Sequence, residues 1–273
     1  MRFRSHLGRD IDLRHLPNLL LIAITLLAGG IALLYWLNGG PAEAIFFAPA
    51  YAFTTWALLR EIDPDHNWTA LVSSILAAAW VLTGGARVSV LALGVLILVG
   101  RVATESTGRR PLVTDLVALL LAAAAGYTAE GWVAAFGLAI ALYLDDRFTE
   151  IRRPAQVWVS AGIAAGATLV ATLTSAFPET LPRVKPAIVL AAGAMALVLV
   201  LRDPAEPITL VDARHKAFLR QDRLHASRSL VGVLVFAMSL ATGEDAQGLL
   251  PTLAALLTVV VSNEIELVRR RSL

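Results

Sequence analysis

The residues best suited to chemistry gather at short charged corners that follow long apolar runs. The first corner places Arg60, Asp63, Asp65 and His66 within seven residues, 60–66. Carboxylate oxygens are the hard ligands that Mg²⁺ prefers, and an imidazole beside them is suited to act as a base. The corner therefore predicts a divalent-cation site. A turn fixed by proline and followed by a helix cap accounts for the same residues without any chemistry.

A second acidic corner, Asp145-Asp146-Arg147, superficially resembles the aspartate-rich motifs that bind magnesium diphosphate in isoprenoid enzymes. Membrane-embedded prenyltransferases carry two such motifs on cytoplasmic loops. Their fuller pattern, an asparagine with aspartates at intervals of four, is absent from both corners of this sequence. The glycine-containing aspartate signature of CDP-alcohol phosphotransferases is absent too. The residues therefore identify no family.

Arginine recurs at the same kind of corner four times along the chain. If the corners meet in space, the arginines would surround the acids and form a polar site suited to a phosphate with its Mg²⁺. The site would comprise Arg60, Arg101, Arg147 and Arg202 together with Asp63, Asp65, His66, Asp145, Asp146 and Asp203. The alternative is that each arginine anchors an inner helix end to lipid headgroups while the neighbouring acids pair with it.

Composition places the chain in a membrane. Of its 273 residues, 57% are hydrophobic and 16% are charged, and the mean hydropathy is +0.70, which is too apolar for a soluble domain of this length. The absence of cysteine excludes disulfides, thiolate nucleophiles and thiolate metal sites. The sequence also lacks the P-loop, dinucleotide-binding, HExxH and serine-elbow patterns.

We predict an all-α fold, a polytopic bundle of about ten short transmembrane helices arranged as hairpins. The apolar stretches that predict spans are 17–37, 44–59, 68–84, 88–100, 116–129, 131–144, 157–176, 186–201, 229–243 and 247–262. With both termini inside, only Arg87, Arg183 and Lys185 of the 23 Lys and Arg residues fall in outer loops. This asymmetry predicts a multi-pass protein of a prokaryotic inner (cytoplasmic) membrane, with both ends in the cytoplasm and lipid around the bundle.

The predicted organisation is a basic segment at 1–16, eight spans at 17–203, a basic connection at 204–228, two spans at 229–264 and a basic tail at 265–273. Within the connection, apolar residues can share a helical face opposite basic ones, which predicts a helix on anionic headgroups. The apolar set is Val211, Phe218, Leu219 and Leu224, and the basic set is Arg214, Lys216, Arg220 and Arg223. A simple basic linker is the alternative.

Small and hydroxyl-bearing residues inside the spans predict contacts rather than chemistry. Gly162 and Gly166 have the spacing of a close helix contact, made within the chain or with another copy of it. Hydroxyl groups could line a path for a solute, although they more often bond to their own backbone. The hydroxyl-bearing residues are Tyr51, Thr54, Thr55, Ser73, Ser74, Thr168 and Thr172.

Three functions fit the sequence. The first is a small transporter-like, solute-handling protein, because the ten-helix layout resembles that of the drug and metabolite transporter superfamily. A proton-driven pump is disfavoured, since no ionisable residue lies near a span centre. The second is an enzyme that acts on a phosphate-bearing lipid at the cytoplasmic face with Mg²⁺, and the third is a non-catalytic subunit or scaffold. Nucleic acid is not an expected partner, because the arginines at 269–271 anchor the last span.

Overall fold

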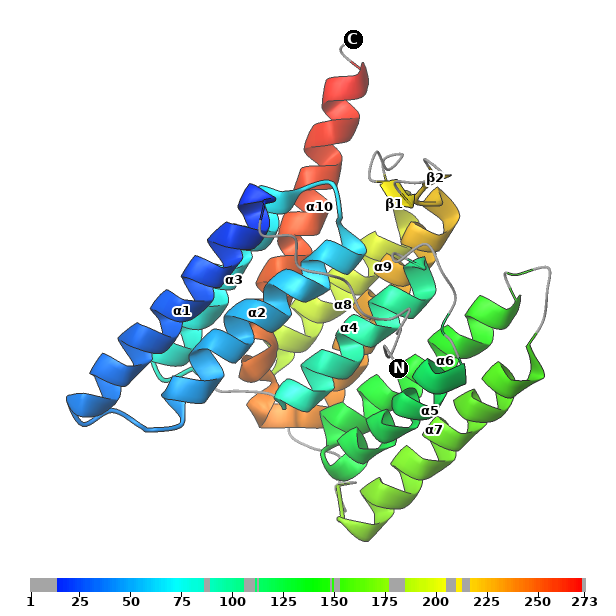
Figure 1. Ribbon diagram of the computed structural model, residues 1–273, viewed down its shortest axis with the longest axis horizontal. Helices are drawn as coiled ribbons and strands as arrows, with labels where there is room; N and C mark the ends of the chain where they lie inside the picture. The colour runs from blue at the N-terminus through cyan, green and yellow to red at the C-terminus, as the bar shows by residue number, and fades with distance from the viewer. Residues whose placement is uncertain are drawn as a thin grey trace.

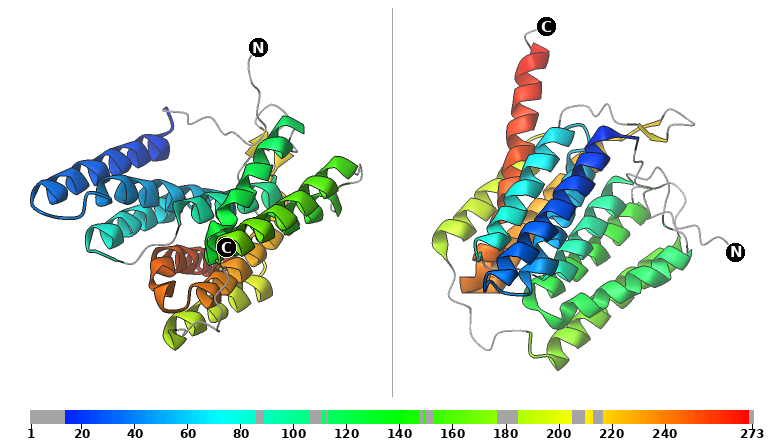
Figure 2. Two further views of the ribbon diagram at one scale, coloured as in Figure 1. Left: turned by 90° about the horizontal axis from the view of Figure 1, so that it is seen from below. Right: turned by 60° about the vertical axis from the view of Figure 1, so that its left-hand side comes forward.

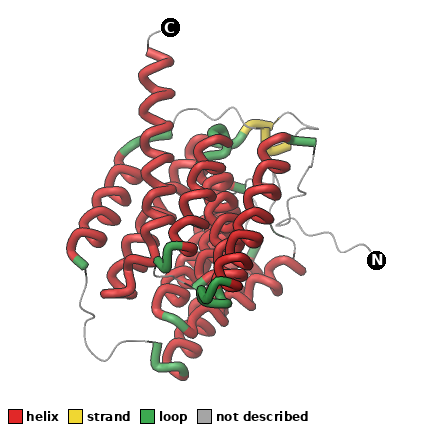
Figure 3. The backbone as a smooth tube through the Cα atoms, turned by 90° about the vertical axis from the view of Figure 1, so that its left-hand side faces the viewer, coloured by secondary structure: helices red, strands yellow, loops and turns green. Residues whose placement is uncertain are grey.

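The computed structural model describes residues 14–85, 89–105, 111, 113–147, 149, 153–176, 185–204, 210–212 and 217–271. Within these ranges the chain is almost wholly helical (Figure 3). The elements are α1 (Leu16–Leu37), α2 (Ala44–Ile62), α3 (Asn67–Leu82), α4 (Val90–Thr104), α5 (Val113–Leu120), the 3-10 helix η1 (Leu121–Tyr127), α6 (Ala129–Arg147), α7 (Pro154–Leu173), α8 (Pro186–Leu201), β1 (Leu210–Asp212), β2 (Ala217–Phe218), α9 (Gln221–Thr242), the 3-10 helix η2 (Gly243–Leu249) and α10 (Leu250–Arg271).

The all-α prediction is confirmed, and a helix occupies each of the ten predicted stretches within the described residues. Four helical stretches are long and apolar enough to cross a membrane: α1, α7, α9 and the stretch from η2 into α10. Helices α3, α4 and α8 and the stretch from α5 through η1 are apolar but shorter. The protein is therefore a multi-pass helical membrane protein whose spans contact the lipid bilayer.

Helices α1 and α3 end in the same kind of glycine-containing turn. Gly39 and Gly84 take positive φ angles of 92° and 79°, which glycine adopts without the strain of a Cβ atom. The next glycine in each turn donates its N–H to the carbonyl of an aromatic residue five positions earlier, Gly40 to Tyr35 and Gly85 to Trp80, both over 2.9 Å. A Cβ at either position would collide with that aromatic ring. The sequence thus ends α1 and α3 and returns the chain into the bundle.

Helices α2, α4, α6 and α9 form the centre of the bundle. Helix α4 packs against α2, α6 and α9, and α6 packs against α9 as well (Figure 1). The other helices surround this centre and turn large apolar side chains outward, among them Leu26 on α1, Leu169 on α7 and Leu190 on α8. Such faces suit hydrocarbon rather than water. Helix α10 continues beyond the bundle at its C-terminal end (Figures 1 and 2).

The spacing of glycines in α7 produces a contact within the chain. A Cβ at Gly162 would lie 3.1 Å from the Leu120 side chain, and one at Gly166 would lie 3.0 Å from Ala123. Gly126 of η1 faces α7 more tightly, because its Cβ would lie 2.4 Å from the carbonyl oxygen of Ala167. These small residues let α5 and η1 approach α7 closely.

The structure corrects two expectations. The stretch 116–129 was expected as one span, but α5 changes to the 3-10 helix η1 after Leu120. For the connection 204–228 a surface helix and a simple basic linker were both open, and its described residues include β1 and β2, which pair antiparallel, in place of the helix. Arg214 and Lys216 of the predicted face lie outside the described residues. Helix α9 begins at Gln221, eight residues before the predicted span, so Arg223 lies inside a packed helix and is 3% exposed rather than on a lipid surface.

Replacing Gly126 by alanine should lower the free energy of unfolding by about 1–3 kcal/mol, because the new methyl group would overlap the Ala167 backbone. Gly94→Ala in α4 is the matched control, since its methyl group would meet nothing within 4 Å. Unfolding in detergent micelles compares the two variants. Equal stability of both would contradict this account of the contact between η1 and α7.

Candidate functional site

The ionisable side chains that are buried in the described residues lie mainly at one end of the bundle. We call the end that holds residues 60–66, 101–105, 145–149 and 220–228 the charged end, and the other end the opposite end. Helices α2, α4 and α6 finish there, whereas α9 begins there. The N-terminal turns of α9 therefore meet the C-terminal ends of three central helices.

One cluster at the charged end surrounds Asp63, which is 1% exposed. Arg228 Nη2 donates to Asp63 Oδ1 over 2.9 Å, and Ser262 Oγ donates to Asp63 Oδ2 over 2.8 Å. His66 Nδ1 lies 2.9 Å from Oδ1. Arg228 also donates to the Ile62 carbonyl over 2.7 Å. The cluster, which we call the Asp63 cluster, joins the C-terminal end of α2 and the N-terminal turns of α9 to the middle of α10.

A second cluster forms around Asp145 of α6, which is also 1% exposed. Arg223 Nη1 donates to Asp145 Oδ1 over 2.7 Å, and Gln156 Nε2 of α7 donates to Oδ2 over 2.7 Å. Arg223 Nη2 lies 3.3 Å from Glu105 Oε1, beyond the end of α4. Arginine and amide donors thus neutralise and orient the buried carboxylate, as burial of a charge requires.

The same helix serves both clusters because of its geometry. Residues five positions apart on an α-helix point in directions about 140° apart. Arg223 and Arg228 have this separation, so one reaches Asp145 on α6 while the other reaches Asp63 beside α2. Helix α9 is therefore held between two acidic helix ends by two opposed arginines.

Neither ion pair follows from helix electrostatics. The C-terminal end of a helix carries partial negative charge and the N-terminal end partial positive charge. Asp63 is the C-cap residue of α2, and Asp145 lies in the last turn of α6, whereas Arg223 lies in the first turn of α9. Each placement costs about 0.3–1 kcal/mol at an exposed helix end. Pairing between the acids and the arginines of α9, rather than the helix dipoles, therefore accounts for these positions.

A third ion pair connects α2 to α4. Arg101 Nε and Nη2 donate to Glu61 Oε1 over 2.9 and 2.6 Å, and Glu61 is 1% exposed. Close by, Ser227 of α9 donates to the Gly100 carbonyl over 3.3 Å. A Cβ at Gly100 would lie 3.2 Å from the Glu61 Cβ, so a larger residue there would press on this pair.

The structure does not bring all ten predicted site residues together. Asp63 and His66 share one cluster, and Asp145 is the centre of another, but the arginines that hold these two acids come from α9 and not from the recurring corners. Of the other corner arginines and acids, Arg60 bonds to Asn67 and to the Pro64 carbonyl, Asp65 is half-buried, and Arg101 pairs with Glu61.

The remaining four residues of the predicted site have local partners or are exposed. Asp146 accepts the Arg153 N–H over 2.7 Å, and Arg147 donates to the Tyr143 hydroxyl. Arg202 lies 3.6 Å from Glu264, and Asp203 is exposed.

The proposed metal site depends on several acids meeting at one point. Within the described part of the chain, no group of three or more histidine and acidic side chains is placed to hold a metal ion. Asp63 and Asp145 have arginine, hydroxyl and amide partners instead. The acids therefore act in this structure as partners of cations on α9.

Three residues at the centre of these clusters were missed by sequence reasoning: Glu61, Arg228 and Ser262. Arg223 was noticed, but as part of a surface face. The sequence does contain a signal for Arg223 and Arg228, because the residues around them can extend the helix of the apolar run after 229 toward its N-terminus. Their spacing of five then indicates two different neighbours rather than one lipid-facing stripe.

A polar track leads from the Asp63 cluster into the bundle between α3 and α10. Ser262 contacts Asp63, and one turn earlier on the same face of α10 Thr258 lies 3.4 Å from Ser73 Oγ on α3. One further turn along, Ala254 lines a hollow of about 390 Å³ at the opposite end. The other lining residues are Leu76, Ala79, Trp80, Thr83, Leu250 and Pro251. We call this line of contacts the α3–α10 seam.

The seam is short along the membrane normal. Ala254 and Ser262 are eight residues apart, which is about 12 Å of helix. Along α10, the contact between Ser73 and Thr258 lies between the hollow and the Asp63 cluster.

Other hydroxyl groups that could line a path bond to their own helices. Thr54 donates to the Ala50 carbonyl, Ser74 to Leu71, Thr168 to Ala164 and Thr172 to Thr168, each over 2.8 Å. Ser73 differs from these because its hydroxyl lies 3.4 Å from that of Thr258 on another helix.

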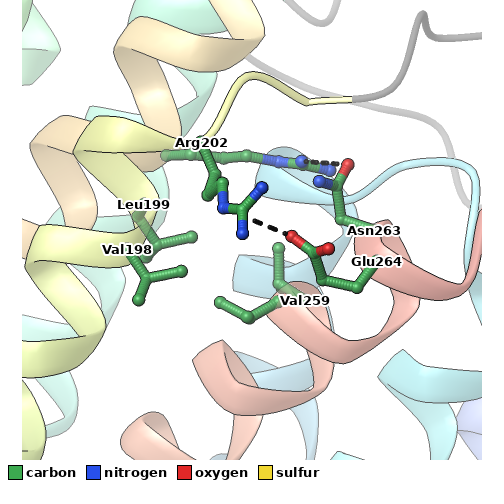
Figure 4. Close-up of a pocket in the computed structure, with 8 residues that line it drawn as sticks. Val198, Leu199, Arg202, Val259, Asn263 and Glu264 are labelled. Carbon is green, nitrogen blue, oxygen red and sulfur yellow. Dashed lines mark hydrogen bonds and ion pairs between the residues drawn. The ribbon is translucent and has the colours of Figure 1, made fainter. Parts of the chain in front are cut away.

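A narrow pocket on the other side of α10 has room for about one water molecule, with a volume near 10 Å³. Figure 4 shows Arg202 of α8 directed toward Glu264 of α10 across it, above Val198, Leu199 and Val259. Arg228 also lines this pocket, so the Asp63 cluster lies beside it. Helix α10 thus has space next to it at its N-terminal turns and beside its middle.

Comparisons with protein-family models, with curated proteins and with solved structures find no match to this chain.

Removing the cation beside Asp145 should be costly. Arg223→Met is expected to lower the free energy of unfolding by about 3–5 kcal/mol, because the carboxylate would stay buried without its partner. Arg147→Met removes an exposed arginine at the same end of α6 and should cost about 0–1 kcal/mol. Adding Asp145→Asn to Arg223→Met should recover part of the loss. Chemical unfolding in micelles measures all three, and equal losses for the two arginines would refute the assignment.

The histidine between α2 and α3 makes a pH-dependent contribution to stability. The hydrogen bond with Asp63 raises the pKa of His66 above its ordinary value of 6.5, and the charges of Asp63 and Asp65 add to this effect, while burial and Arg228 oppose it. Because the folded-state pKa is the higher one, the stabilisation is complete below about pH 6.5 and is lost as the pH rises through the folded-state pKa.

The difference in melting temperature between the native protein and His66→Gln should therefore be largest below pH 6.5 and should shrink at higher pH. Thermal unfolding of both proteins from pH 5 to about pH 9 measures this difference. A difference that stays constant over the range, or grows with pH, would contradict the contact with Asp63.

Proposed function

We propose that the protein is a small transporter-like protein that moves a neutral or amphipathic solute along the α3–α10 seam. In this proposal the protein lies in the inner (cytoplasmic) membrane of a prokaryote and the charged end faces the cytoplasm, as the distribution of Lys and Arg indicates. The observation that carries the proposal is the stacking of a hollow, a hydroxyl pair and a buried charged cluster on successive turns of α10.

The chemistry of the seam suggests the class of solute. The hollow at the opposite end is lined by aliphatic and aromatic side chains and one hydroxyl, that of Thr83. The next polar groups are the hydroxyls of Ser73 and Thr258. Among the described lining residues a charged solute would find no opposite charge, whereas a solute with an apolar body and a few hydrogen-bonding groups would be accommodated.

The Asp63 cluster has the properties of a gate at the charged end. Ser262 and Asn263 of α10 bond to Asp63 and Arg228, which fixes α10 against α2 and α9. A buried ion pair gains little net stability over a well-packed apolar contact, because desolvation offsets its attraction. Water entering the cluster can therefore replace these contacts at modest cost, and α10 would be released.

A second candidate function is that of a subunit in a larger membrane complex. Helix α10 projects beyond the bundle at the charged end, and Ile265 and Val268 on this projection are 63% and 64% exposed (Figure 2). Apolar side chains in that position would suit a protein partner. The enzyme alternative has less support, because the described acids do not assemble the shared Mg²⁺ site that it requires.

The native chain has no cysteine, so one introduced thiol reports on one position. In this proposal Ser73→Cys should react with a small membrane-impermeant thiol reagent added from the opposite end, because Leu76, one turn further along α3, lines the hollow. Adding Asp63→Asn, which loosens the cluster, should increase the labelling from the charged end by about tenfold or more. Protein reconstituted in vesicles of known orientation, with reagent added to either side, gives both rates.

Ser74→Cys is the matched control, since Ser74 is adjacent on α3, fully buried and bonded to its own helix. It should stay unlabelled from both sides with and without Asp63→Asn. If Ser73→Cys behaves like Ser74→Cys in both backgrounds, the seam is closed packing and the transport proposal fails in favour of the subunit.

A further inference from the structure

The histidine of the Asp63 cluster differs from its charged partners because it reaches water. The His66 side chain is 29% exposed, whereas those of Asp63 and Arg228 are 2% and 6% exposed. Imidazole is the side chain whose charge ordinarily changes between about pH 5 and pH 8. His66 can therefore exchange a proton with the solution at the charged end while it contacts a carboxylate that is buried inside the bundle.

The turn between α2 and α3 fixes this contact. Asp63 is the C-cap residue of α2, and His66 is the N-cap residue of α3. Arg60 donates across the turn to the Pro64 carbonyl over 2.5 Å, and Thr69 of α3 donates to the His66 carbonyl over 2.6 Å. The imidazole is thereby held beside Oδ1 of Asp63, the carboxylate whose other oxygen, Oδ2, accepts the hydroxyl of α10.

That hydroxyl, of Ser262, has two acceptors within reach. It lies 2.8 Å from Asp63 Oδ2 and 3.0 Å from the Val259 carbonyl of its own helix. A hydroxyl has a single hydrogen to donate, so the two bonds compete. When the hydrogen points to Val259, the donor stays satisfied but the link between α10 and the end of α2 is lost. Helix α10 therefore has an attached and a released arrangement.

Protonation of the imidazole favours the attached arrangement. The charged groups that act on His66 are Asp63 and Asp65 of the same turn and Arg228 of α9, and α10 contributes an uncharged hydroxyl. The hydrogen bond with Asp63 raises the pKa of His66. Water that enters the cluster would separate the imidazole from the carboxylate and remove this effect. A proton that binds more tightly in one arrangement stabilises that arrangement.

We infer that a proton on His66 keeps α10 attached to the Asp63 cluster and that loss of this proton releases it. The inference names the regulation of the gate at the charged end and so rests on the proposed function. A fall in pH on that side closes the gate, and a rise in pH opens it.

Two nitroxide labels on the full chain in micelles measure the position of α10. They are attached at Val72→Cys on α3 and Ile265→Cys on α10, because these side chains are 52% and 63% exposed and the native chain has no cysteine. Double electron–electron resonance should give one distance at about pH 5 and an additional, longer one at about pH 9. The ratio of released to attached protein should rise by about threefold or more. A ratio that stays constant, or that falls as the pH rises, would overturn the inference.

Three further variants carry the same labels. His66→Gln has no titrating group, so it should show the released arrangement to the same extent at every pH. Ser262→Ala lacks the link to Asp63 and should also lose the response. His225→Gln is the matched control and should keep it, since His225 is a histidine of α9 at the same end with a side chain that is 30% exposed. A response that survives in His66→Gln or Ser262→Ala, or that is lost in His225→Gln, would contradict the assignment to His66.

The labelling of Ser73→Cys separates this inference from the transport proposal, because the distance between the nitroxides is measured without any solute. A distance that responds to pH while Ser73→Cys stays unlabelled from both sides would refute transport and retain the pH-dependent contact. Labelling of Ser73→Cys together with a distance that does not respond to pH would refute the inference alone.

Discussion

Two carboxylates buried at the ends of α2 and α6 must each find a cation, and both cations come from the first turns of α9. Arg228 neutralises Asp63 and Arg223 neutralises Asp145 in surroundings where an unpaired charge would be severely destabilising. The position of α9 in the centre of the bundle depends on this requirement, because moving the helix by one turn would separate both pairs. The packing of α4 and α6 against α9 and the attachment of α10 through Ser262 follow from it.

These pairs contribute more to specificity than to net stability. An acid at a helix C-terminus and an arginine at a helix N-terminus both oppose the helix dipole, and a buried pair also loses its hydration. Apolar side chains of similar size would hold α9 at lower cost. The charged pairs instead select one register of α9 against α2 and α6, and they provide a contact that water can replace. This second property connects the fold to the gate that we propose at the charged end.

The helices could be predicted from the sequence because each needs only local information, an apolar run bounded by charge, glycine or proline. The change from α5 to η1 could not be predicted, since leucine and alanines follow Leu120 directly and Gly126, which disfavours a helix, comes only near the end of η1. The charged corners were correctly identified as places where polar residues concentrate. Their partners were not, because Arg223 and Asp145 are 78 residues apart and Arg228 and Asp63 are 165 apart. A single sequence gives no sign of which distant corners meet, and basic residues beside a span suggest headgroup anchors first.

The most direct test of the central claim is a double-mutant cycle between Asp63 and Arg228, with Asp63→Asn, Arg228→Gln and the double variant unfolded in the same micelles. If α9 is held by this pair, the sum of the losses in the two single variants should exceed the loss in the double variant by a coupling energy above about 1 kcal/mol. Losses that add to within about 0.5 kcal/mol would show that the residues act independently. That result would contradict the placement of α9 by charge pairing.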